Sequence, residues 1–399
     1  MIAIKDINNI NPLKIFPWAD NTFVDAKGRD IICVNVLIDG YEFHSKKELT
    51  DYLIFTDHCK VEYIFTYENG RKLKIPANKK TFSGRKNHIL NSVIFDLDIL
   101  GRLNNAIDFP LDDNYFYKKI NHKNIFMKYI RKFMIFFKIC REKIIGIDRW
   151  SIYVAPLKIE PEEIYNDFYK FKKIFHPKDS FIADPFLVEK DNRTYVFYEK
   201  YSFNKGKGII VARDITDINF PSEEILILEE KYHLSYPNVF IHNDIYFMIP
   251  QSSNGCIDLY KCNNFPSVWE KVHTFIKRED IEFGDTNIYI TNEGIITLET
   301  NIYDHPWKSN SNRLRVTVGD NLYEKVKLDD FVIVSLGDDC SRNGGQSQRK
   351  IYQNSLKTYG GSIVANIDGD ISDIKKPKGY SGMHTYNASE NFTTVDLKN

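Results

Sequence analysis

The stretch FIADPFLVEKDNRTYVFYEKY (residues 181–201) contains the features that decide the fold. Asp184 and Pro185 stand just before an apolar run, and the run Thr194–Glu199 follows after a short polar break. Short runs of Val, Ile, Phe and Tyr that alternate with Asn, Gly, Asp and Pro are typical of strands joined by turns. The same texture continues from about residue 150 to the end of the chain. It predicts a mainly β fold: a sandwich, a barrel or a propeller.

A similar local pattern returns at intervals that suit a propeller, whose four-stranded blades take about 40 to 50 residues each. The first-blade residue Asp184 has four counterparts further along the chain: Tyr236 in LSYPNVFI, Asp285 in FGDTNIYI, Arg342 in CSRNGG and His384 in GMHTYN. In a propeller, such residues at the mouths of the innermost strands face one shared funnel. We therefore expect five blades over residues 150–399, with these five side chains converging.

Several segments resemble known carbohydrate-active propellers. Residues 181–201, followed by KGKGIIVA (205–212), resemble the first blade of the five-bladed propellers of glycoside hydrolase family 43. The chain more closely resembles the propeller domain at the N-terminus of plant glucosamine inositolphosphorylceramide transferases, a domain also found in bacterial surface-polysaccharide proteins. That resemblance is carried by HLSYPNVFIHNDIYFMIPQSS (233–253), IDLYKCNNFPSVWEKV (257–272), RNGGQSQRKIYQNSLKTYGGSI (342–363) and GMHTYN (382–387).

The resemblance implies a carbohydrate-active propeller without fixing its activity. In the plant proteins the transfer chemistry is assigned to a separate C-terminal domain, whereas in the hydrolases the propeller itself is catalytic. Asp184 matches the hydrolases' general base, and Asp285 stands where they carry their acid. The second blade offers Tyr236-Pro237-Asn238 where a further acid is expected, and Gln251 replaces a usual Glu. Since glycoside hydrolysis uses two carboxyl groups that flank the bond, these departures weaken a simple glycosidase.

Other residues add a second chemistry to the expected funnel. Arg342 carries a bidentate donor fork suited to phosphate, and His233 and His384 can titrate near neutrality. The alternatives are a salt bridge between blades for Arg342 and ordinary hydrogen bonding for each His. We predict Asp184, Asp285 and His384 as catalytic. The predicted substrate-binding residues are Glu199, His233, Tyr236, Asn238, Arg342 and Gln353. Glu199 and Glu299, which each end a second-strand pattern, can instead be structural acids.

The first part of the chain differs from the β region. Residues 1–112 combine strand-like runs (Ile31–Ile38, Val61–Tyr67 and Val93–Ile99) with a short helical pattern near Ser45–Tyr52, which predicts a small α/β or α+β domain. The triplet Asp96-Leu97-Asp98 has the form with which many glycosyltransferases hold a divalent metal. Such a triplet is common by chance, and we predict no metal site; whether a metal is used stays open.

Residues 113–149 form a basic linker between these two parts. Within it, residues 118–143 carry Lys and Arg at three- and four-residue steps among Phe and Ile, which predicts a basic amphipathic helix. It either packs between domains with a solvated basic face or lies on an anionic membrane surface.

Composition limits the class of protein. Lys+Arg 54 balances Asp+Glu 54, so general nucleic-acid binding is not expected. The six cysteines form no CxxC pair, which argues against a zinc site or a disulfide framework. Without a signal-like start or a long apolar segment, we expect a cytoplasmic protein, peripheral on the inner face of the membrane if the basic helix binds there.

Three functions are compatible with these observations. The first is a glycosyltransferase of cell-surface polysaccharide or glycolipid biosynthesis that takes a sugar from a nucleotide-sugar donor to a glycan or lipid-linked acceptor. The second is a family 43-like hydrolase, and the third is a glycan-binding propeller without catalysis. Measuring the separation of the carboxylates is the cheap discriminator for hydrolysis.

The ends of the β region predict how it closes. Trp150–Ala155 precedes the first blade and Asn391–Asp396 ends the chain, and both have strand patterns. Because open sheet edges pair elsewhere unless they are covered, we expect these segments to lie in neighbouring or shared blades. This closure would bring His384 close to Asp184, with the closing segment itself carrying no chemistry.

Overall fold

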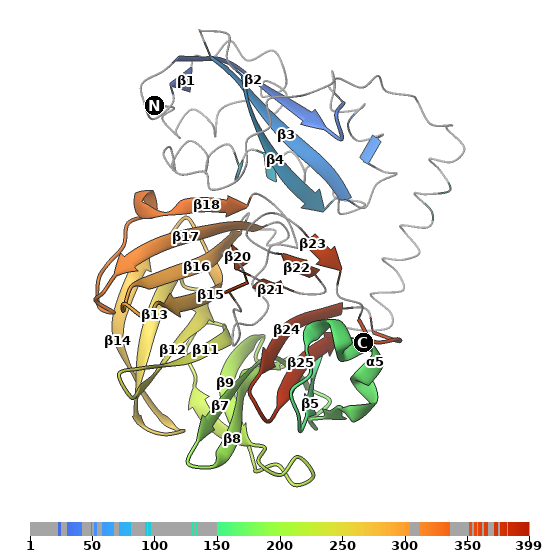
Figure 1. The fold of residues 1–399 in the computed structure, drawn as a ribbon, viewed down its shortest axis with the longest axis vertical. Coiled ribbons are helices and arrows are strands. Elements are labelled where there is room, and N and C mark those ends of the chain that lie inside the picture. The colour runs from blue at the N-terminus through green and yellow to red at the C-terminus, as the bar shows by residue number, and fades with distance from the viewer. Residues whose placement is uncertain are drawn as a thin grey trace. The chain divides into compact units, whose positions relative to one another are not determined.

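The computed structural model describes the β region almost continuously and the rest of the chain in short segments (Figure 1). In the β region the described ranges are 150–303, 311–335, 351–352, 355–356, 358–360, 363–365, 371–373, 376–380 and 382–398. Before it they are 23–24, 30–41, 49, 52–53, 58–67, 72–80, 92–93, 95–96, 130 and 133. No helix among the described residues is long and apolar enough to cross a membrane.

The N-terminal unit comprises residues 1–147, 303–314 and 328–339. Its sheet has the order β1-β2-β3-β4 and is antiparallel throughout. The strands are β1 (Phe23–Val24), β2 (Asp30–Ile38), β3 (His58–Tyr67) and β4 (Lys72–Lys80). Buried aliphatic residues on β2 and β3, such as Val36, Ile38 and Val61, supply its core. The strands predicted over Ile31–Ile38 and Val61–Tyr67 are therefore confirmed.

The strand predicted over Val93–Ile99 is wrong where the structure describes it, because Ser92, Val93, Phe95 and Asp96 are helical. A short apolar run is compatible with a buried helix as well as a strand, and periodicity alone does not separate the two. Of the basic segment 118–143, only Ile130 and Phe133 are described. Both are helical and exposed, and the remainder of the predicted helix lies outside the described residues.

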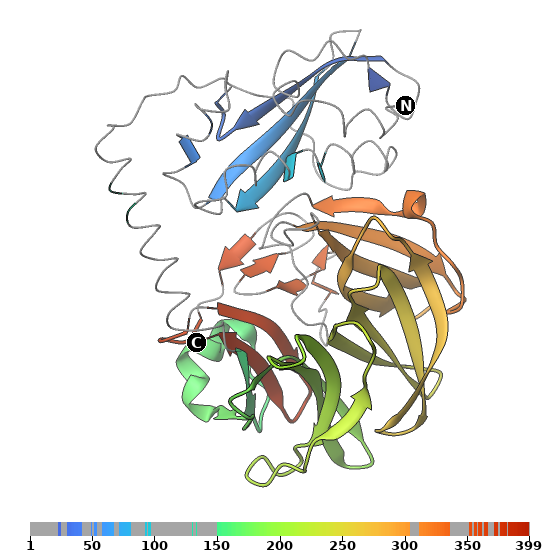
Figure 2. The same cartoon turned by 180° about the vertical axis from the view of Figure 1, so that it is seen from behind.

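The second unit, residues 148–302, 315–327 and 340–399, is built from antiparallel sheets whose strands mostly follow one another in sequence. The first sheet contains β7 (Ser180–Lys190), β8 (Arg193–Ser202), β9 (Lys207–Asp214) and β10 (Ile225–Leu228). The second contains β11 (Leu234–His242), β12 (Ile245–Ser252), β13 (Cys256–Asn264) and β14 (Val268–Lys277). Figures 1 and 2 show these sheets side by side.

The third sheet continues the pattern, and parts of its last strands group with the N-terminal unit. It consists of β15 (Phe283–Ile290), β16 (Ile296–Tyr303), β17 (Ser311–Gly319) and β18 (Val332–Ser335). Short strands follow: β19 (Ile351–Tyr352), β20 (Ser355–Leu356), β21 (Thr358–Gly360), β22 (Ile363–Ala365) and β23 (Ile371–Asp373). The mainly β, propeller-like prediction is thus confirmed, while five closed blades remain a prediction.

The last sheet joins the two ends of the β region. It has the order β24-β25-β5-β6, with β24 (Gly382–Ala388), β25 (Thr393–Lys398), β5 (Trp150–Ala155) and β6 (Lys172–Lys173). A short helical segment lies between β5 and β6: η2 (Pro161–Glu163), α5 (Ile164–Asp167) and η3 (Phe168–Lys170). β25 pairs with β5 from Thr393↔Ala155 to Lys398↔Trp150. The predicted sharing of a sheet by the two terminal segments is confirmed.

The first two sheets open with the same hairpin. Asp191 and Asn192 have φ values of 51° and 59° between β7 and β8, and Asn243 and Asp244 have 50° and 61° between β11 and β12. Two consecutive residues with positive φ define a type I′ turn, whose twist matches that of the flanking strands. Asn and Asp tolerate this conformation better than other residues with a Cβ.

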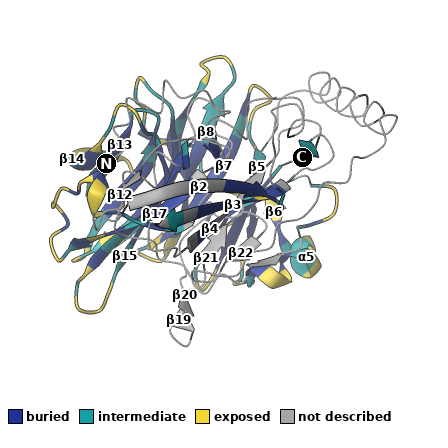
Figure 3. Cartoon of the chain, turned by 90° about the horizontal axis from the view of Figure 1, so that it is seen from above, coloured by how far each residue is buried: buried dark blue, intermediate teal, exposed yellow. Residues whose placement is uncertain are grey.

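Apolar side chains pack between neighbouring sheets. One cluster joins Phe186 and Phe197 of the first sheet to Leu234, Tyr236 and Met248 of the second. A second cluster joins strand β5 to the other face of the first sheet. The two clusters cover both faces of β7 and β8. This agrees with the mostly apolar sequences of the two strands, and Figure 3 shows them mostly as buried. This packing places the starts of β7, β11 and β15 close together.

Candidate functional site

The predicted equivalent residues lie at equivalent backbone distortions. Asp184, Tyr236 and Asp285 have φ values of 54°, 46° and 48°. Each stands where the register of its strand shifts against the next strand, as expected at a β-bulge. His384 stands at a fourth such shift, between Met383 and Tyr386 on β24. Positive φ at residues other than Gly is strained and persists only where the surroundings enforce it, so the repeated pattern in the sequence marks a repeated structural device.

A side-chain oxygen from a neighbouring sheet binds the backbone N–H at each of the three positive-φ positions. The Asp184 N–H donates to Asp396 Oδ2 at 2.9 Å, and the Tyr236 N–H donates to Asp184 Oδ2 at 3.2 Å. The Asp285 N–H donates to Gln251 Oε1, also at 3.2 Å. Buried N–H groups that the strand ladder leaves unpaired need such acceptors. These bonds therefore fix the bulges and tie neighbouring sheets together.

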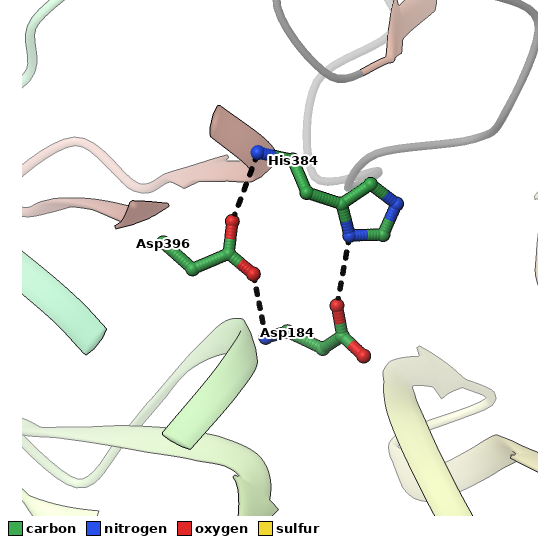
Figure 4. Close-up of side chains that lie close together, drawn as sticks. All are labelled: Asp184, His384 and Asp396. Atoms are coloured by element: carbon green, nitrogen blue, oxygen red, sulfur yellow. Dashed lines mark hydrogen bonds and ion pairs between the residues drawn. The ribbon is translucent and has the colours of Figure 1, made fainter. Parts of the chain in front are cut away.

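Asp184 and His384 meet across the join between β7 and β24 (Figure 4). His384 Nδ1 lies 3.0 Å from Asp184 Oδ1, and the Thr385 hydroxyl donates to the same oxygen at 3.0 Å. When Asp184 is ionised its oxygens only accept hydrogen bonds, and Nδ1 is then the donor in this pair. The Asp184 and His384 side chains are 9% and 14% exposed, which leaves a small part of each in reach of solvent. The predicted proximity of His384 to Asp184 is confirmed.

Asp285 completes the group on the other side of the imidazole. Its Oδ2 lies 3.9 Å from His384 Nε2, and Asn301 Nδ2 donates to the same oxygen at 3.5 Å. The Asp285 side chain is only 1% exposed, so it stands behind His384 rather than at the surface. The imidazole thus lies between two carboxylates, an arrangement that favours its protonated form electrostatically. All three predicted catalytic residues are brought together.

Asp396 on β25 is a member of this group that sequence reasoning missed. It is fully buried, and its Oδ1 accepts the N–H groups of His384 and Thr385 at 3.1 and 2.6 Å. Burial raises the pKa of Asp396 to about 6; His384 opposes the rise and the Asp184 carboxylate adds to it. The closing segment was expected to carry no chemistry, and that stays a prediction; the structure adds that its Asp396 carboxylate contacts both halves of the site. The signal in the sequence was an Asp between Val395 and Leu397 in a strand pattern, where a buried charge needs donors.

Tyr236 and Asn238, predicted to bind substrate, tie β11 to β15. The Tyr236 hydroxyl donates to Asn287 Oδ1 at 2.9 Å, and Asn238 Nδ2 donates to the Thr286 carbonyl at 2.9 Å. Both side chains are fully buried. In this structure their polar atoms serve contacts between sheets.

Glu199 and His233 form a second histidine–carboxylate pair. His233 Nε2 lies 3.7 Å from Glu199 Oε1, and His233 Nδ1 accepts the Gly208 N–H at 2.9 Å. A Cβ on Gly208 would stand 2.4 Å from the Leu234 carbonyl oxygen and 2.7 Å from Glu199 Oε1, so only glycine allows this approach. The pair belongs to the contact between the first and second sheets.

Strand register shows which residues are equivalent on the second strands. Glu199, Gln251 and Asn301 pair with the residues that immediately precede the three bulge positions. Glu299 is therefore not the counterpart of Glu199. It is fully buried and accepts Arg315 Nε at 3.1 Å, which is the structural role left open for it.

The remaining predicted residues are elsewhere. Arg342 and Gln353 lie outside the residues whose side chains are described. Asp96 is fully buried in the N-terminal unit and accepts hydrogen bonds from the Tyr63 hydroxyl and from Asn312 Nδ2. Asp96, the first residue of the Asp96-Leu97-Asp98 triplet, therefore makes structural hydrogen bonds within this unit.

Within the described part of the chain, Asp184, His384 and Asp396 offer ligand atoms within 4.8 Å of one another, close enough to surround a metal ion. The donor set fits this poorly, because both Asp396 oxygens already accept backbone N–H groups and both Asp184 oxygens are also engaged. The arrangement is a hydrogen-bonded acid–imidazole cluster, suited to holding or moving a proton.

The acid–imidazole cluster at the strand bulges of the β region is the candidate functional site. Residues 172–360 match the family model "Glucosamine inositolphosphorylceramide transferase 1, N-terminal". The chain is 32% identical over 121 residues to glucosamine inositolphosphorylceramide transferase 1 of Arabidopsis thaliana, covering 30% of this chain and 15% of the relative. The enzyme of the same name from Oryza sativa subsp. japonica is 37% identical over 98 residues, covering 23% of this chain and 13% of the relative. The resemblance predicted from the sequence is confirmed, and the matched part spans only about 15% of the length of these curated relatives.

Similar solved structures include glycoside hydrolases. A thermostable family-43 glycoside hydrolase matches with a TM-score of 0.37 and 11% identity, covering 55% of this chain and 88% of that chain. The catalytic domain of Coprinopsis cinerea GH62 alpha-L-arabinofuranosidase matches with a TM-score of 0.37 and 10% identity, covering 63% of this chain and 97% of that chain.

Proposed function

We propose that this protein is a glycosyltransferase that transfers a sugar from a nucleotide-sugar donor to a glycan or lipid-linked acceptor in the synthesis of a cell-surface polysaccharide or glycolipid. The observation that carries the proposal is the meeting of Asp184, His384 and Asp285 at three strand bulges. The match to the N-terminal region of a glucosamine inositolphosphorylceramide transferase supports the class of activity.

In the proposed reaction Asp184 is the general base. As the acceptor hydroxyl oxygen forms its bond to the anomeric carbon, its proton passes to the Asp184 carboxylate, and the bond from that carbon to the donor phosphate breaks. Asp184 and His384 are the members of the group that solvent reaches, so a substrate can contact them. Asp285, on the far side of the imidazole, stabilises positive charge on His384.

Further parts of the proposal concern residues outside the described part of the chain. Arg342 would bind the donor phosphate through its guanidinium fork, and Gln353 would contact substrate beside it. The basic segment 118–143 would hold a cytoplasmic enzyme against the inner face of a membrane, where lipid-linked acceptors reside. The experiment below is designed to identify the donor and to test whether a divalent metal is used.

The position of His384 separates this proposal from the hydrolase alternative. In a glycosidase the two carboxyl groups flank the scissile bond with the sugar between them. Here the imidazole lies between Asp184 and Asp285, at 3.0 Å from the one and 3.9 Å from the other. This geometry favours transfer over hydrolysis; the hydrolase and a glycan-binding protein without catalysis are the two alternatives that the experiment separates.

The proposal is tested with a panel of nucleotide sugars, with and without Mg²⁺ or Mn²⁺. We expect one donor class to raise the melting temperature and to release free nucleotide, slowly alone and faster with an acceptor glycan. Asp184→Asn should keep the thermal shift and lose the release. Asp280→Asn, at an exposed ion pair with Arg278, is the matched control and should behave as wild type. The absence of a response to every donor would overturn the proposal, and cleavage of oligosaccharides without nucleotide would support the hydrolase instead.

A further inference from the structure

The Asp396 carboxylate joins two segments that lie some 200 residues apart in the chain. Its Oδ2 accepts the N–H of Asp184 on β7, and its Oδ1 accepts the N–H groups of His384 and Thr385 on β24 (Figure 4). The three distances are 2.9, 3.1 and 2.6 Å. One side chain thus holds the backbones of both residues whose side chains meet at the centre of the site.

The position of these N–H groups explains why a side chain is needed. Asp184 and His384 stand where β7 and β24 lose register with their neighbours, between Ala183 and Phe186 and between Met383 and Tyr386. A bulge leaves its extra residue outside the regular ladder, and a buried N–H group without an acceptor is costly. Asp396, fully buried on the strand beside β24, supplies acceptors for both bulges.

We propose that Asp396 is a positioning residue, whose carboxylate fixes the backbones of Asp184 and His384 so that their side chains stay at hydrogen-bond distance. The proposal deepens the proposed function and rests on it in one respect, namely that Asp184 and His384 act on substrate. Catalytic groups lose rate steeply when they are displaced by a fraction of an ångström to 1 Å. Holding both partners through one rigid group restricts such movement.

Position 396 needs a carboxylate as the hydrogen-bond acceptor. Three N–H groups approach from two directions, so both oxygens must accept, and only a carboxylate provides two acceptor atoms. On the second sheet Gln251, whose register counterpart on β25 is Leu397 rather than Asp396, serves the single N–H of Asp285 with its one oxygen, and an amide suffices there. An amide at position 396 would turn its NH₂ group toward a backbone N–H, with loss of at least one of the three bonds.

The first experiment reads the contacts directly in the full-length protein. Selective ¹⁵N labelling of Asp, His and Thr reports the amides of Asp184, His384 and Thr385 during a pH titration. We expect all three to shift with one shared midpoint near pH 6, because burial raises the pKa of Asp396 to about 6. The groups that face Asp396 are the Asp184 carboxylate and the His384 imidazole, so each can add a second step of its own.

The variants decide whether Asp396 causes the shared step. In Asp396→Asn the step near pH 6 should disappear from all three amides. Thr394→Val is the matched control: it removes a buried hydroxyl that donates to the Asn387 carbonyl on the same strand pair without touching the site, and the step should persist. Three unrelated midpoints, or a step that survives in Asp396→Asn, would overturn the proposal whether or not the protein is a glycosyltransferase.

The second experiment measures turnover of whichever donor the panel identifies. Asp396→Asn should lower kcat by about 10-fold or more with KM nearly unchanged, whereas Thr394→Val should keep kcat within about 2-fold of wild type. If Asp396→Asn does not fold, Asp396→Glu replaces it; this variant keeps two acceptor oxygens but displaces the backbones, and its kcat should fall similarly. An unchanged kcat in a folded variant would overturn the positioning role, while the absence of turnover in wild type would overturn the proposed function alone and leave the titration to decide.

Discussion

The sheets β7–β10 and β11–β14 share one construction but place different side chains at the same point. Each begins with a strand that bulges at a residue with positive φ, and each continues through a two-residue turn of type I′. At the bulge the first sheet carries Asp184, which meets His384, and the second carries Tyr236, whose hydroxyl binds Asn287. The bulge is therefore a shared backbone feature, and the side chain that stands on it decides which contacts are made there.

We expect the largest effect from removing β25, which supplies the acceptor for the bulge of the first sheet but not for that of the third. Deleting residues 388–399 removes the strand between β24 and β5 and the oxygen that holds the Asp184 N–H, although it removes no residue of the Gln251 contact with the third sheet. We expect loss of folding and of any ligand response, measured by solubility, circular dichroism and thermal melting. A truncated protein that melts like the full chain and binds as before would contradict the closure.

The next effect concerns the two bulge residues themselves. Asp184→Asn should lower donor turnover by about 100-fold or more, the usual contribution of a general base. Tyr236→Phe should keep turnover within about 3-fold and instead lower stability by about 1 kcal/mol, because Asn287 loses a buried hydrogen bond. Steady-state kinetics and urea unfolding separate the two results. Equal losses of turnover in both variants would show that the second sheet contributes chemistry as well.

The repeated bulge positions could be predicted from the sequence more fully than the hydrogen bonds that side chains make around them. The spacing of Asp184, Tyr236, Asp285 and His384 reflects a repeated backbone device, so a pattern search finds it. The role of Asp396 depends on three N–H groups from two strands, β7 and β24, and a single Asp in an apolar strand does not reveal which donors approach it. Burial and strand register, which appear only on folding, also decided that Glu299 pairs with Arg315 rather than entering the site.

The convergence of five side chains was predicted from a repeated pattern and an expected funnel, and the structure describes four of them. Asp184, Asp285 and His384 do meet, whereas the hydroxyl of Tyr236 binds Asn287 instead. The short run Val93–Ile99 shows the opposite case. Apolar composition indicated burial there but not the kind of element: Val93, Phe95 and Asp96 within the run are helical, as is Ser92 just before it.

A smaller effect tests the contact between the two sheets. In Gly208→Ala the new Cβ would meet the Leu234 carbonyl oxygen at 2.4 Å, and a backbone atom cannot rotate away. We expect a loss of about 2 to 3 kcal/mol in the free energy of unfolding, measured by urea denaturation. Gly206→Ala is the control: nothing lies within 4 Å of its Cβ, and its φ of +65° should cost only about 1 kcal/mol. Equal losses would mean that the sheets adjust freely at this point.

The smallest expected effect tests whether the two type I′ turns respond to the same substitution with the same change in stability. Asn192 and Asp244 occupy the second central position of their turns, with φ values of 59° and 61°. Glycine adopts this conformation without a Cβ penalty, although its greater freedom in the unfolded chain offsets part of the gain. Asn192→Gly and Asp244→Gly should therefore each stabilise the protein by about 0.5 kcal/mol, seen as a higher urea midpoint at unchanged slope. The same change at Arg193, where extended strand begins, should instead cost about 1 kcal/mol. Gains that differ clearly between the two turns would show that the first sheet, which carries the acid of the site, holds its hairpin under a different constraint from the second.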